Sequence, residues 1–507
     1  MIRPATPMPI PPPESGTANG WLICAAHKSS GKTTLAIGLS AALRSQGLTV
    51  QPFKKGPDYI DPMWLTLAAA RSCRNLDPHL AGWQQTEAQF RRHALASGLN
   101  LVEANHGLHD GLAADGSDSN AALGVRLSLS AVMVLDARGV GRSIAPLVLG
   151  FQAFEPKLRF AGVILNRVGA SRHETRLRQA LERYTDLPVL GAIGQNPQLE
   201  IAERHLGLTP SNEAASPATL VARLAQAVRE GVNLPSLIAN ITATASPPST
   251  RTVSVSVNAS TQPASPAGSV PDSRSSDDGP VQIAIARDAA FGFYYPDDLE
   301  ALEASGARLI PFDAMRDSHL PQVDALFIGG GFPEMHAARL EANVALRTQL
   351  RELLDAGLPA YAECGGLMYL TRSIRIDERR FEMVGAIAGD AVMHDRPVGR
   401  GYVRLASTEA FPWPALSGIP DTPDTRETLA HEFHHSSLEN LPADTRYAYR
   451  VLRGHGVDGM RDGIVQRNLL ASYAHRRSTG SDPWPARFVA FVRQVRARRA
   501  AGASLAA

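Results

Sequence analysis

A cysteine lies between an apolar segment and two glycines in the sequence LPAYAECGGLMYL, residues 358–370. The apolar segment predicts a strand and LMYL predicts a helix, so Cys364 would occupy a sharp turn between them. This is the geometry of a nucleophile elbow, in which glycines permit the turn and the nucleophile faces the crevice. Helix N-termini also favour the thiolate form of cysteine. The pattern predicts a nucleophile, and a small buried cysteine is the ordinary alternative.

Two other segments could supply the groups that a cysteine nucleophile needs. ALFIGGGFPE leads an apolar strand into glycines, and the backbone N–H groups of Gly330 and Gly331 could stabilise an oxyanion. His475 ends the apolar segment LLASYAH and could be the general base, which must be near the thiol in space only. HEFHHS, residues 431–436, suggests a metal cluster at first. Because no cysteine accompanies these histidines, a helix cap or core packing is the favoured interpretation.

The segment ICAAHKSSGKTTLAIGL predicts a strand, a loop and the start of a helix. Such a loop aims backbone N–H groups at phosphate, and its core here is Gly31, Lys32, Thr33 and Thr34. Lys32 would reach the β- and γ-phosphates, and Thr33 would place its hydroxyl on Mg²⁺. The standard phosphate-loop pattern has a glycine where this chain has Ala26, so an accidental match at a helix N-terminus is the alternative. The context favours nucleotide binding.

Acidic residues follow two of the predicted strands and could hold the metal of a nucleotide site. Asp58 lies in PFKKGPDYIDP, and Glu103 ends the apolar segment LNLVE. The carboxyl ends of parallel strands line the ligand crevice of an α/β sheet, which favours Asp58 and Glu103 as metal ligands, with Asp61 a weaker candidate. Solvated or capping carboxylates are the usual alternative. Asn166, in GVILNRV, could contact the nucleotide base or cap a loop.

The elements that must position these residues divide into two α/β halves. Short β-branched segments alternate with helical stretches in residues 20–237 and again in 281–500, which predicts parallel sheets covered by helices on both faces. Residues 238–280 are mostly Ser, Thr, Pro, Ala and Val, and so predict a flexible linker. Its VSVSV piece could form a short edge strand. The proline-rich residues 1–19 are expected to be a disordered tail rather than a signal peptide.

Composition excludes several classes of function. The 507 residues contain 51 Lys and Arg against 49 Asp and Glu, and this net charge of +2 gives no field for nucleic acid or an anionic membrane. No apolar segment reaches the roughly 18 residues that a membrane span needs. The 3 cysteines are widely scattered and suggest no disulfide framework. A cytoplasmic protein in a reducing compartment is therefore expected.

These motifs together resemble a known family over nearly the whole chain outside the tail and linker. AECGGLMYL, GGGFPE, HEFHHS and ASYAH are similar to the glutaminase half of cobyrinic acid a,c-diamide synthases. AHKSSGKTT, FKKGPDYIDP, the VE-to-GLHDG stretch and GVILNRV are similar to the ATP-dependent half of the same enzymes. The resemblance implies an N-terminal P-loop NTPase-like (dethiobiotin synthetase-like) domain and a C-terminal class I (triad) glutamine amidotransferase domain.

The resemblance also implies a reaction. Cys364 would attack the amide of L-glutamine, His475 would be its base, and ammonia would be released. ATP, with Mg²⁺, would phosphorylate the a and c acetate carboxylates of a corrin, and ammonia would displace the phosphate to give amides. The substrate would be cobyrinic or hydrogenobyrinic acid. In this family the loop that includes Asp58, Tyr59 and Asp61 is expected to meet metal and substrate carboxylate.

The chain departs from the family pattern at several positions. Ala25, Ala26 and Ser29 stand where the family has glycines and a threonine, and residues 104–107 replace a Val-Met-Gly-like stretch. Many triad amidotransferases carry a glutamate two residues after the histidine, where this chain has Arg477. The third member of the triad is thus absent or comes from elsewhere.

Alternatives remain open at this level. An amidase of another tetrapyrrole, such as a cobyric acid synthase or a nickel-sirohydrochlorin diamide synthase, would share the architecture. A non-catalytic P-loop switch with a partner-binding domain is the alternative from another class, although such a scaffold needs no thiol site. The sequence does not decide whether the corrin carries cobalt, in which order the two amidations occur, or whether a homodimer forms.

Overall fold

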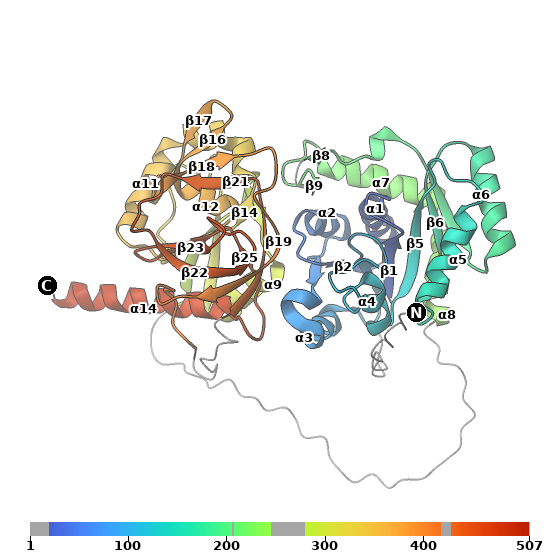
Figure 1. The fold of residues 1–507 in the computed structure, drawn as a ribbon, viewed down its shortest axis with the longest axis horizontal. Helices are drawn as coiled ribbons and strands as arrows, with labels where there is room; N and C mark the ends of the chain where they lie inside the picture. The colour runs from blue at the N-terminus through green and yellow to red at the C-terminus, as the bar shows by residue number, and fades with distance from the viewer. Residues whose placement is uncertain (1–19, 205–206, 245–278, 417–426, 506–507) are drawn as a thin grey trace, which may run out of the picture.

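The computed structural model describes residues 20–204, 207–244, 279–416 and 427–505 (Figure 1). The expected tail and the VSVSV piece lie outside the described residues. Helix α8 (Leu234–Thr244) continues into the segment expected to be a linker, of which residues 245–278 are not described. The two α/β halves lie side by side, with β19 and α9 of the second half facing α2 and α3 of the first (Figure 1).

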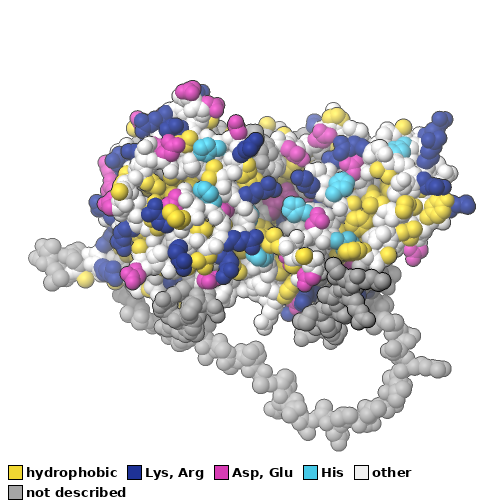
Figure 2. All heavy atoms as spheres, viewed as in Figure 1, with side chains coloured by type: hydrophobic (Ala, Val, Ile, Leu, Met, Phe, Trp, Pro, Cys, Tyr) yellow, Lys and Arg dark blue, Asp and Glu magenta, His cyan; other side chains and the backbone are white. Residues whose placement is uncertain are grey.

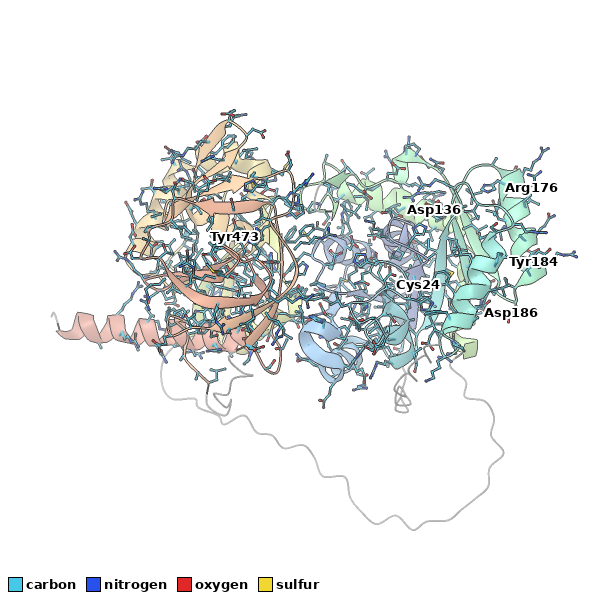
Figure 3. All side chains as sticks on the ribbon, viewed as in Figure 1. Cys24, Asp136, Arg176, Tyr184, Asp186 and Tyr473 are labelled. Carbon is cyan, nitrogen blue, oxygen red and sulfur yellow. The ribbon has the colours of Figure 1, made fainter. Side chains whose placement is uncertain are left out.

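The first half is a seven-stranded parallel sheet with the order β3-β2-β4-β1-β5-β6-β7. Successive residues of β1 alternate between two hydrophobic cores: Trp21 lies in the core that contains Leu35 and Trp64, while Cys24 (labelled in Figure 3) lies in the core that contains Phe90 and Leu177. The predicted parallel sheet with helices on both faces is confirmed for this half. The strands are β1 (Gly20–Ala25), β2 (Val50–Lys55), β3 (Arg74–Leu76), β4 (Leu99–Glu103), β5 (Ser130–Asp136), β6 (Arg159–Val168) and β7 (Val189–Gly194).

The helices of this half are α1 (Lys32–Ser45), α2 (Ile60–Ala69), α3 (Pro78–His93), α4 (Asn120–Arg126), α5 (Ile144–Phe154), α6 (Ser171–Tyr184) and α7 (Pro217–Gly231). A 3-10 turn (Pro197–Leu199) and the short strands β8 (Glu203–Arg204) and β9 (Gly207–Leu208) follow β7. Figure 2 shows apolar side chains gathered over α5, where Phe154 is 75% exposed. None of the helices in the described part of the chain is long and apolar enough to cross a membrane.

The second half is built on a ten-stranded sheet with the order β12-β10-β13-β15-β24-β23-β22-β19-β20-β25. The first five strands in this order are parallel, as predicted: β12 (Ala307–Phe312), β10 (Val281–Ala286), β13 (Ala325–Ile328), β15 (Ala360–Glu363) and β24 (Leu469–Ser472). The other five pair in antiparallel fashion with their neighbours. They are β23 (Arg461–Gln466), β22 (Arg446–Arg453), β19 (Gly399–Ser407), β20 (Glu427–His434) and β25 (His475–Arg476). The parallel strands of this half were predicted from the sequence, whereas its antiparallel strands were not.

Helices cover both faces of this sheet as well. Helices α10 (Ala337–Ala342), α11 (Val344–Asp355) and α12 (Gly365–Leu370) pack in one core, while α9 (Pro296–Ala304) and α14 (Trp484–Leu505) pack in the other. A small sheet holds β17 (Arg379–Glu382), β16 (Thr371–Ile376), β18 (Ile387–Met393) and β21 (Ser436–Glu439). The pair β11 (Phe291–Phe293) and β14 (Gly330–Gly331), with a 3-10 turn at Pro333–His336, completes the half.

The two halves share hydrophobic packing. Phe293 and Phe332 of the second half are buried in the same core as α1 and α2 of the first. Tyr59 and Met63 pack against that core from the first half. Polar contacts surround it: the Tyr402 hydroxyl donates to Asp77 across 3.0 Å. The two halves therefore meet through an apolar centre with a polar border.

Candidate active sites

Cys364 occupies the strand-to-helix turn that the sequence predicts. It ends β15 with φ 48° and ψ −103°, a combination rare for a residue with a side chain, and α12 begins at the next residue. Such strained conformations persist where the surrounding structure enforces them, and they cluster at active sites. The backbone N–H of Cys364 donates to the Ser472 carbonyl at 2.8 Å. The residue is buried, with 7% of its surface exposed. The turn thus holds the thiol at the carboxyl edge of the parallel strands.

Two of the glycines near this turn are required by close approach. A Cβ on Gly366 would collide with the carbonyl oxygen of Ile328, at the end of the neighbouring strand β13. A Cβ on Gly330 would collide with the Cε1 atom of His475. The predicted oxyanion pair, Gly330 and Gly331, forms β14 and pairs with β11 beside the thiol turn. The lack of a side chain at Gly330 lets the backbone approach the imidazole, and its lack at Gly331 lets the backbone approach the carbonyl of Ala290.

His475 joins Cys364 as the sequence predicts, and a carboxylate that the sequence analysis missed joins both. The imidazole Nδ1 of His475 lies 3.5 Å from Oε2 of Glu363. Burial by itself lowers the pKa of His475, but its contacts with the Cys364 thiol and the Glu363 carboxylate outweigh burial and raise the pKa to about 10. Glu363 Oε1 accepts hydrogen bonds from the Tyr361 hydroxyl at 2.6 Å and from the Arg476 N–H at 3.0 Å. Cys364, His475 and Glu363 therefore lie together in the arrangement of a catalytic triad.

The histidines of HEFHHS serve packing rather than a metal or a helix cap. They lie on and just after the strand β20, so the helix-cap interpretation was wrong, whereas core packing is confirmed. The His434 ring stacks on Tyr473 at 3.8 Å between centroids, in the interior marked by Tyr473 in Figure 3. Among the described residues, the one group of three potential metal ligands is His93, Asp297 and Glu300. Its two acids are already paired with an arginine.

The predicted phosphate loop connects β1 to α1. Gly31 has φ 91°, and a Cβ there would collide with the side-chain amide of Asn166. That amide donates to the Ser30 carbonyl at 2.9 Å, so Asn166 fastens the loop while also facing the cavity above it. Burial and the neighbouring ammonium of Lys54 lower the pKa of Lys32. A bound anion would compensate both effects.

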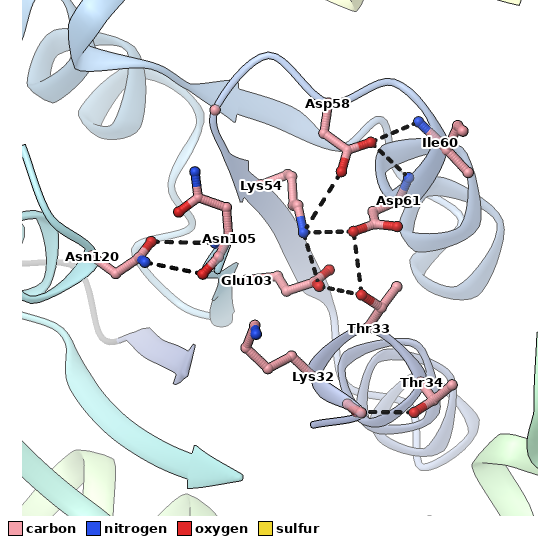
Figure 4. Close-up of polar contacts among 12 residues, drawn as sticks. Lys32, Thr33, Thr34, Lys54, Asp58, Ile60, Asp61, Glu103, Asn105 and Asn120 are labelled. Atoms are coloured by element: carbon pink, nitrogen blue, oxygen red, sulfur yellow. Dashed lines mark hydrogen bonds and ion pairs between the residues drawn. The ribbon is translucent and has the colours of Figure 1, made fainter. Parts of the chain in front are cut away.

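A second lysine, which the sequence analysis did not select, lies at the centre of the acidic residues (Figure 4). Lys54 Nζ lies 2.6 Å from Asp61, 2.9 Å from Glu103 and 3.9 Å from Asp58. The Thr33 hydroxyl donates to Glu103 at 2.5 Å and to Asp61 at 3.2 Å. Burial alone would lower the pKa of Lys54, but the three carboxylates raise it. The structure thus brings together the loop threonine and all three predicted acids around one cation.

Two of these acids are held in distinct ways. Asp58 accepts the N–H groups of Ile60 at 2.9 Å and Asp61 at 3.2 Å, which fixes the start of α2. Glu103 is fully buried, burial raises its pKa, and its Oε2 has no hydrogen-bond partner among the described residues. A buried carboxylate oxygen without a partner is costly unless a ligand satisfies it. A cavity of about 880 Å³ opens above these groups, lined among others by Lys32, Thr33, Asp58, Asn166, Ile193 and Leu199.

Tyr59 lies between the two sites. It precedes α2 in the chain, directly between Asp58 and the acid-bearing first turn of that helix. Its ring centroid is 5.0 Å from that of His475, 4.4 Å from that of Tyr295 and 5.4 Å from that of Phe293. One aromatic residue of the phosphate-loop domain therefore contacts the histidine of the thiol site.

The comparisons with known proteins agree with this two-site arrangement. Residues 21–208 match the model of the CobQ/CobB/MinD/ParA nucleotide binding domain, and residues 282–482 match that of the CobB/CobQ-like glutamine amidotransferase domain. A cobyrinate a,c-diamide synthase of Magnetococcus marinus is 43% identical, covering 91% of this chain and 94% of the relative. This chain belongs to the cobyrinate a,c-diamide synthase family.

Other members of the family show how far the similarity extends. The cobyrinate a,c-diamide synthase of a Synechococcus species is 37% identical, with 91% of this chain and 96% of the relative covered. That of Methanosarcina acetivorans is 36% identical over 91% of this chain and 93% of the relative. The resemblance stated from the motifs is thereby confirmed, as is the fold class of a nucleotide-binding domain followed by a glutamine amidotransferase domain.

Proposed function

We propose that this protein converts the a and c acetate carboxylates of cobyrinic or hydrogenobyrinic acid into amides in cobalamin biosynthesis, with ATP and L-glutamine as co-substrates. The observation that carries the proposal is the contact between two complete sites: His475 of the thiol triad meets Tyr59, whose neighbour Asp58 belongs to the phosphate-loop site. The family membership supports the corrin as the substrate class. Making an amide from a carboxylate and glutamine needs one site that activates the carboxylate and another that releases ammonia, and this chain carries a candidate for each.

The thiol site would supply the ammonia. The Cys364 sulfur attacks the side-chain carboxamide carbon of glutamine, and His475 delivers a proton to the leaving nitrogen, which departs as ammonia. Water then attacks the resulting thioester with His475 as base and releases glutamate. Glu363 keeps the imidazole oriented through this cycle, and the N–H groups of Gly330 and Gly331 face the developing oxyanion. The low exposure of Cys364 and His475 keeps other water away.

The phosphate-loop site would activate the corrin. A carboxylate is a poor electrophile, so an acetate oxygen attacks the γ-phosphorus of ATP and gives an acyl phosphate and ADP. Ammonia then attacks the acyl carbon, and phosphate leaves. Gly31, Lys32 and Thr34 of the loop would hold the phosphates, Asn166 would contact the nucleotide base, and the 58–61 segment would meet the acetate.

The residues around Lys54 fit Mg²⁺. A hydroxyl and carboxylates are the ligands that this ion prefers, and Thr33, Asp58 and Glu103 offer them, with Asp61 adjacent. The unpartnered Oε2 of Glu103 is an available ligand atom. When bound, Mg²⁺ would neutralise charge on the ATP phosphates. The Lys54 ammonium pairs with the same three acids and would add positive charge beside the bound phosphates.

The test offers cobyrinic acid and hydrogenobyrinic acid separately with ATP, Mg²⁺ and glutamine, and identifies the products by mass. We expect two amidations on one of these corrins, each accompanied by one ADP and one glutamate. Cys364→Ala should lose the reaction with glutamine and keep it with ammonium. If ATP is consumed and neither corrin gains an amide, the corrin assignment fails.

A further inference from the structure

Arg477 directly follows β25, the strand that carries His475, and its side chain reaches into the other domain. It is 2% exposed, and its Nη2 donates to the backbone carbonyl of Asn75 and, at 2.7 Å, to Oε1 of Gln89. Successive residues of an extended segment point to opposite sides, so Arg477 projects on the same side as His475, while Arg476 pairs with Asp482 on the other. The position that carries a triad carboxylate in many amidotransferases here carries a contact between domains.

Asn75 passes this contact to the loop that carries the acids. Asn75 is 1% exposed, and its side-chain amide donates to the carbonyl of Gly56 at 2.8 Å and to that of Asp58 at 2.7 Å. The Tyr295 hydroxyl, from the amidotransferase domain, donates to the carbonyl of Pro57 at 3.3 Å. The backbone of residues 56–58 is therefore held by one buried asparagine and by the other domain.

The strand of His475 and the 56–61 loop are thus connected twice. The first connection is direct, because the Tyr59 ring contacts the His475 ring. The second runs from Arg477 through Asn75 to the backbone on either side of Pro57. Closely packed groups transmit displacement. A shift of the 56–61 loop must therefore also move the buried side chains of Arg477 and His475.

We propose that Arg477 is a positioning residue that couples glutamine hydrolysis to occupation of the carboxylate-activating site. Bound nucleotide and acceptor fix residues 56–61. These residues in turn hold Arg477 and Tyr59, and so place the His475 imidazole for proton transfer. With that site empty the loop is less constrained and glutamine hydrolysis is slow. This inference rests on the proposed function of the two sites. Coupling of this kind typically changes a rate or affinity by about 5- to 150-fold.

A second arginine at the same interface, Arg74, provides a control that distinguishes coupling through Arg477 from simple contact between the domains. Arg74 crosses the same interface and pairs with Asp297 at 2.8 Å and Glu300 at 2.5 Å, but its hydrogen bonds go to these two acids and not to the 56–61 loop. Arg74→Gln should weaken the interface without cutting the link through Asn75. Arg477→Gln should cut that link.

The experiment compares the wild type, Arg477→Gln and Arg74→Gln by measuring the glutamate, ADP and amide that each produces. Each protein is assayed with glutamine alone, with glutamine plus ATP and corrin, and with ammonium plus ATP and corrin. In the wild type we expect acceleration of glutamine hydrolysis by ATP and corrin, and about one glutamate per amide. In Arg477→Gln the acceleration should fall at least about fivefold and the glutamate-to-amide ratio should rise. Amidation with ammonium should stay within about twofold, and Arg74→Gln should resemble the wild type.

Two results would overturn the proposal: full acceleration with an unchanged ratio in Arg477→Gln, or an equal loss in both variants. If Arg477→Gln does not fold, Asn75→Asp, which removes the donors to Gly56 and Asp58, should give the same loss of coupling. If the wild type amidates no tetrapyrrole even with ammonium, the proposed function fails instead. The coupling can then still be tested by measuring how far ATP alone accelerates glutamine hydrolysis in Arg477→Gln and in Arg74→Gln. A smaller acceleration in Arg477→Gln would support the coupling, and equal accelerations would contradict it.

Discussion

The rings of His475 and Tyr59 lie 5.0 Å apart, although these residues belong to different catalytic domains. Tyr59 directly follows Asp58 in the chain, so one residue separates the acidic segment from the ring that contacts His475. Substitutions at the thiol site can be separated from those at the phosphate-loop site by supplying ammonium.

Glu363→Gln should lower the rate of glutamine hydrolysis by about 10²-fold or more, because a neutral amide cannot stabilise the imidazolium form of His475. Amidation supported by ammonium should be unchanged. Steady-state kinetics with each nitrogen source measure both effects. Glu352→Gln, an exposed position on α11, is the control and should behave as the wild type. An unimpaired Glu363→Gln enzyme would remove Glu363 from the triad.

Gly330→Ala should abolish most glutamine-dependent activity, since the added methyl group would occupy the space of the His475 Cε1 atom. Overpacking a buried site typically costs about 1–3 kcal/mol, so the melting temperature should also fall. Gly150→Ala, where a Cβ meets nothing within 4 Å, is the matched control: it should leave glutaminase activity unchanged and keep or slightly raise the melting temperature, because alanine favours the helix α5 more than glycine does. Calorimetry and glutaminase assays measure the two properties, and wild-type behaviour of Gly330→Ala would contradict the close approach.

Glu103→Gln should impair amidation with glutamine and with ammonium alike, because it removes a buried charge next to Thr33 and Lys54. We expect the Mg²⁺ concentration for half-maximal activity to rise about tenfold or more, in line with the loss of one carboxylate ligand. Titration of activity and of ATP binding with Mg²⁺ gives this value. Basal glutamine hydrolysis without ATP serves as the internal control. An unaltered Mg²⁺ dependence would place the metal elsewhere.

The raised pKa of His475 predicts a dependence of stability on pH. Its folded pKa of about 10 exceeds the unfolded value near 6.5, so the protonated form stabilises the fold. This contribution is complete below about pH 6.5 and is lost as the pH rises through about 10. The difference in free energy of unfolding between the wild type and His475→Gln should therefore shrink across that range, as urea unfolding at pH 6, 8 and 10 would measure. A constant difference would contradict the raised pKa.

Local sequence patterns predicted the features that depend on local geometry. The turn at Cys364 follows from glycines after a strand, and the loop at Lys32 follows from its position between a strand and a helix. Acids at the ends of strands converged because all parallel strands of a sheet present their carboxyl ends at one edge. These rules act over a few residues or over one sheet.

The missed residues depend on contacts distant in sequence. Lys54 became central only because β2 lies beside β4, which places it against Glu103. Glu363 is adjacent to the nucleophile in sequence, but its role depends on β25 bringing His475 back to it. Arg477 reaches Asn75 across about 400 residues of chain, and no periodicity encodes that contact. The antiparallel half of the second sheet was missed for the same reason.

The burial of Phe293 and Phe332 in the core of the first half has a consequence for cutting the chain. A fragment containing the second half alone would expose both aromatic rings to water, and the first half alone would lose part of its own interior. The two domains are therefore not independent units that could be exchanged for others. A foreign glutaminase could replace this one only if it also carried the side chains that complete its neighbour.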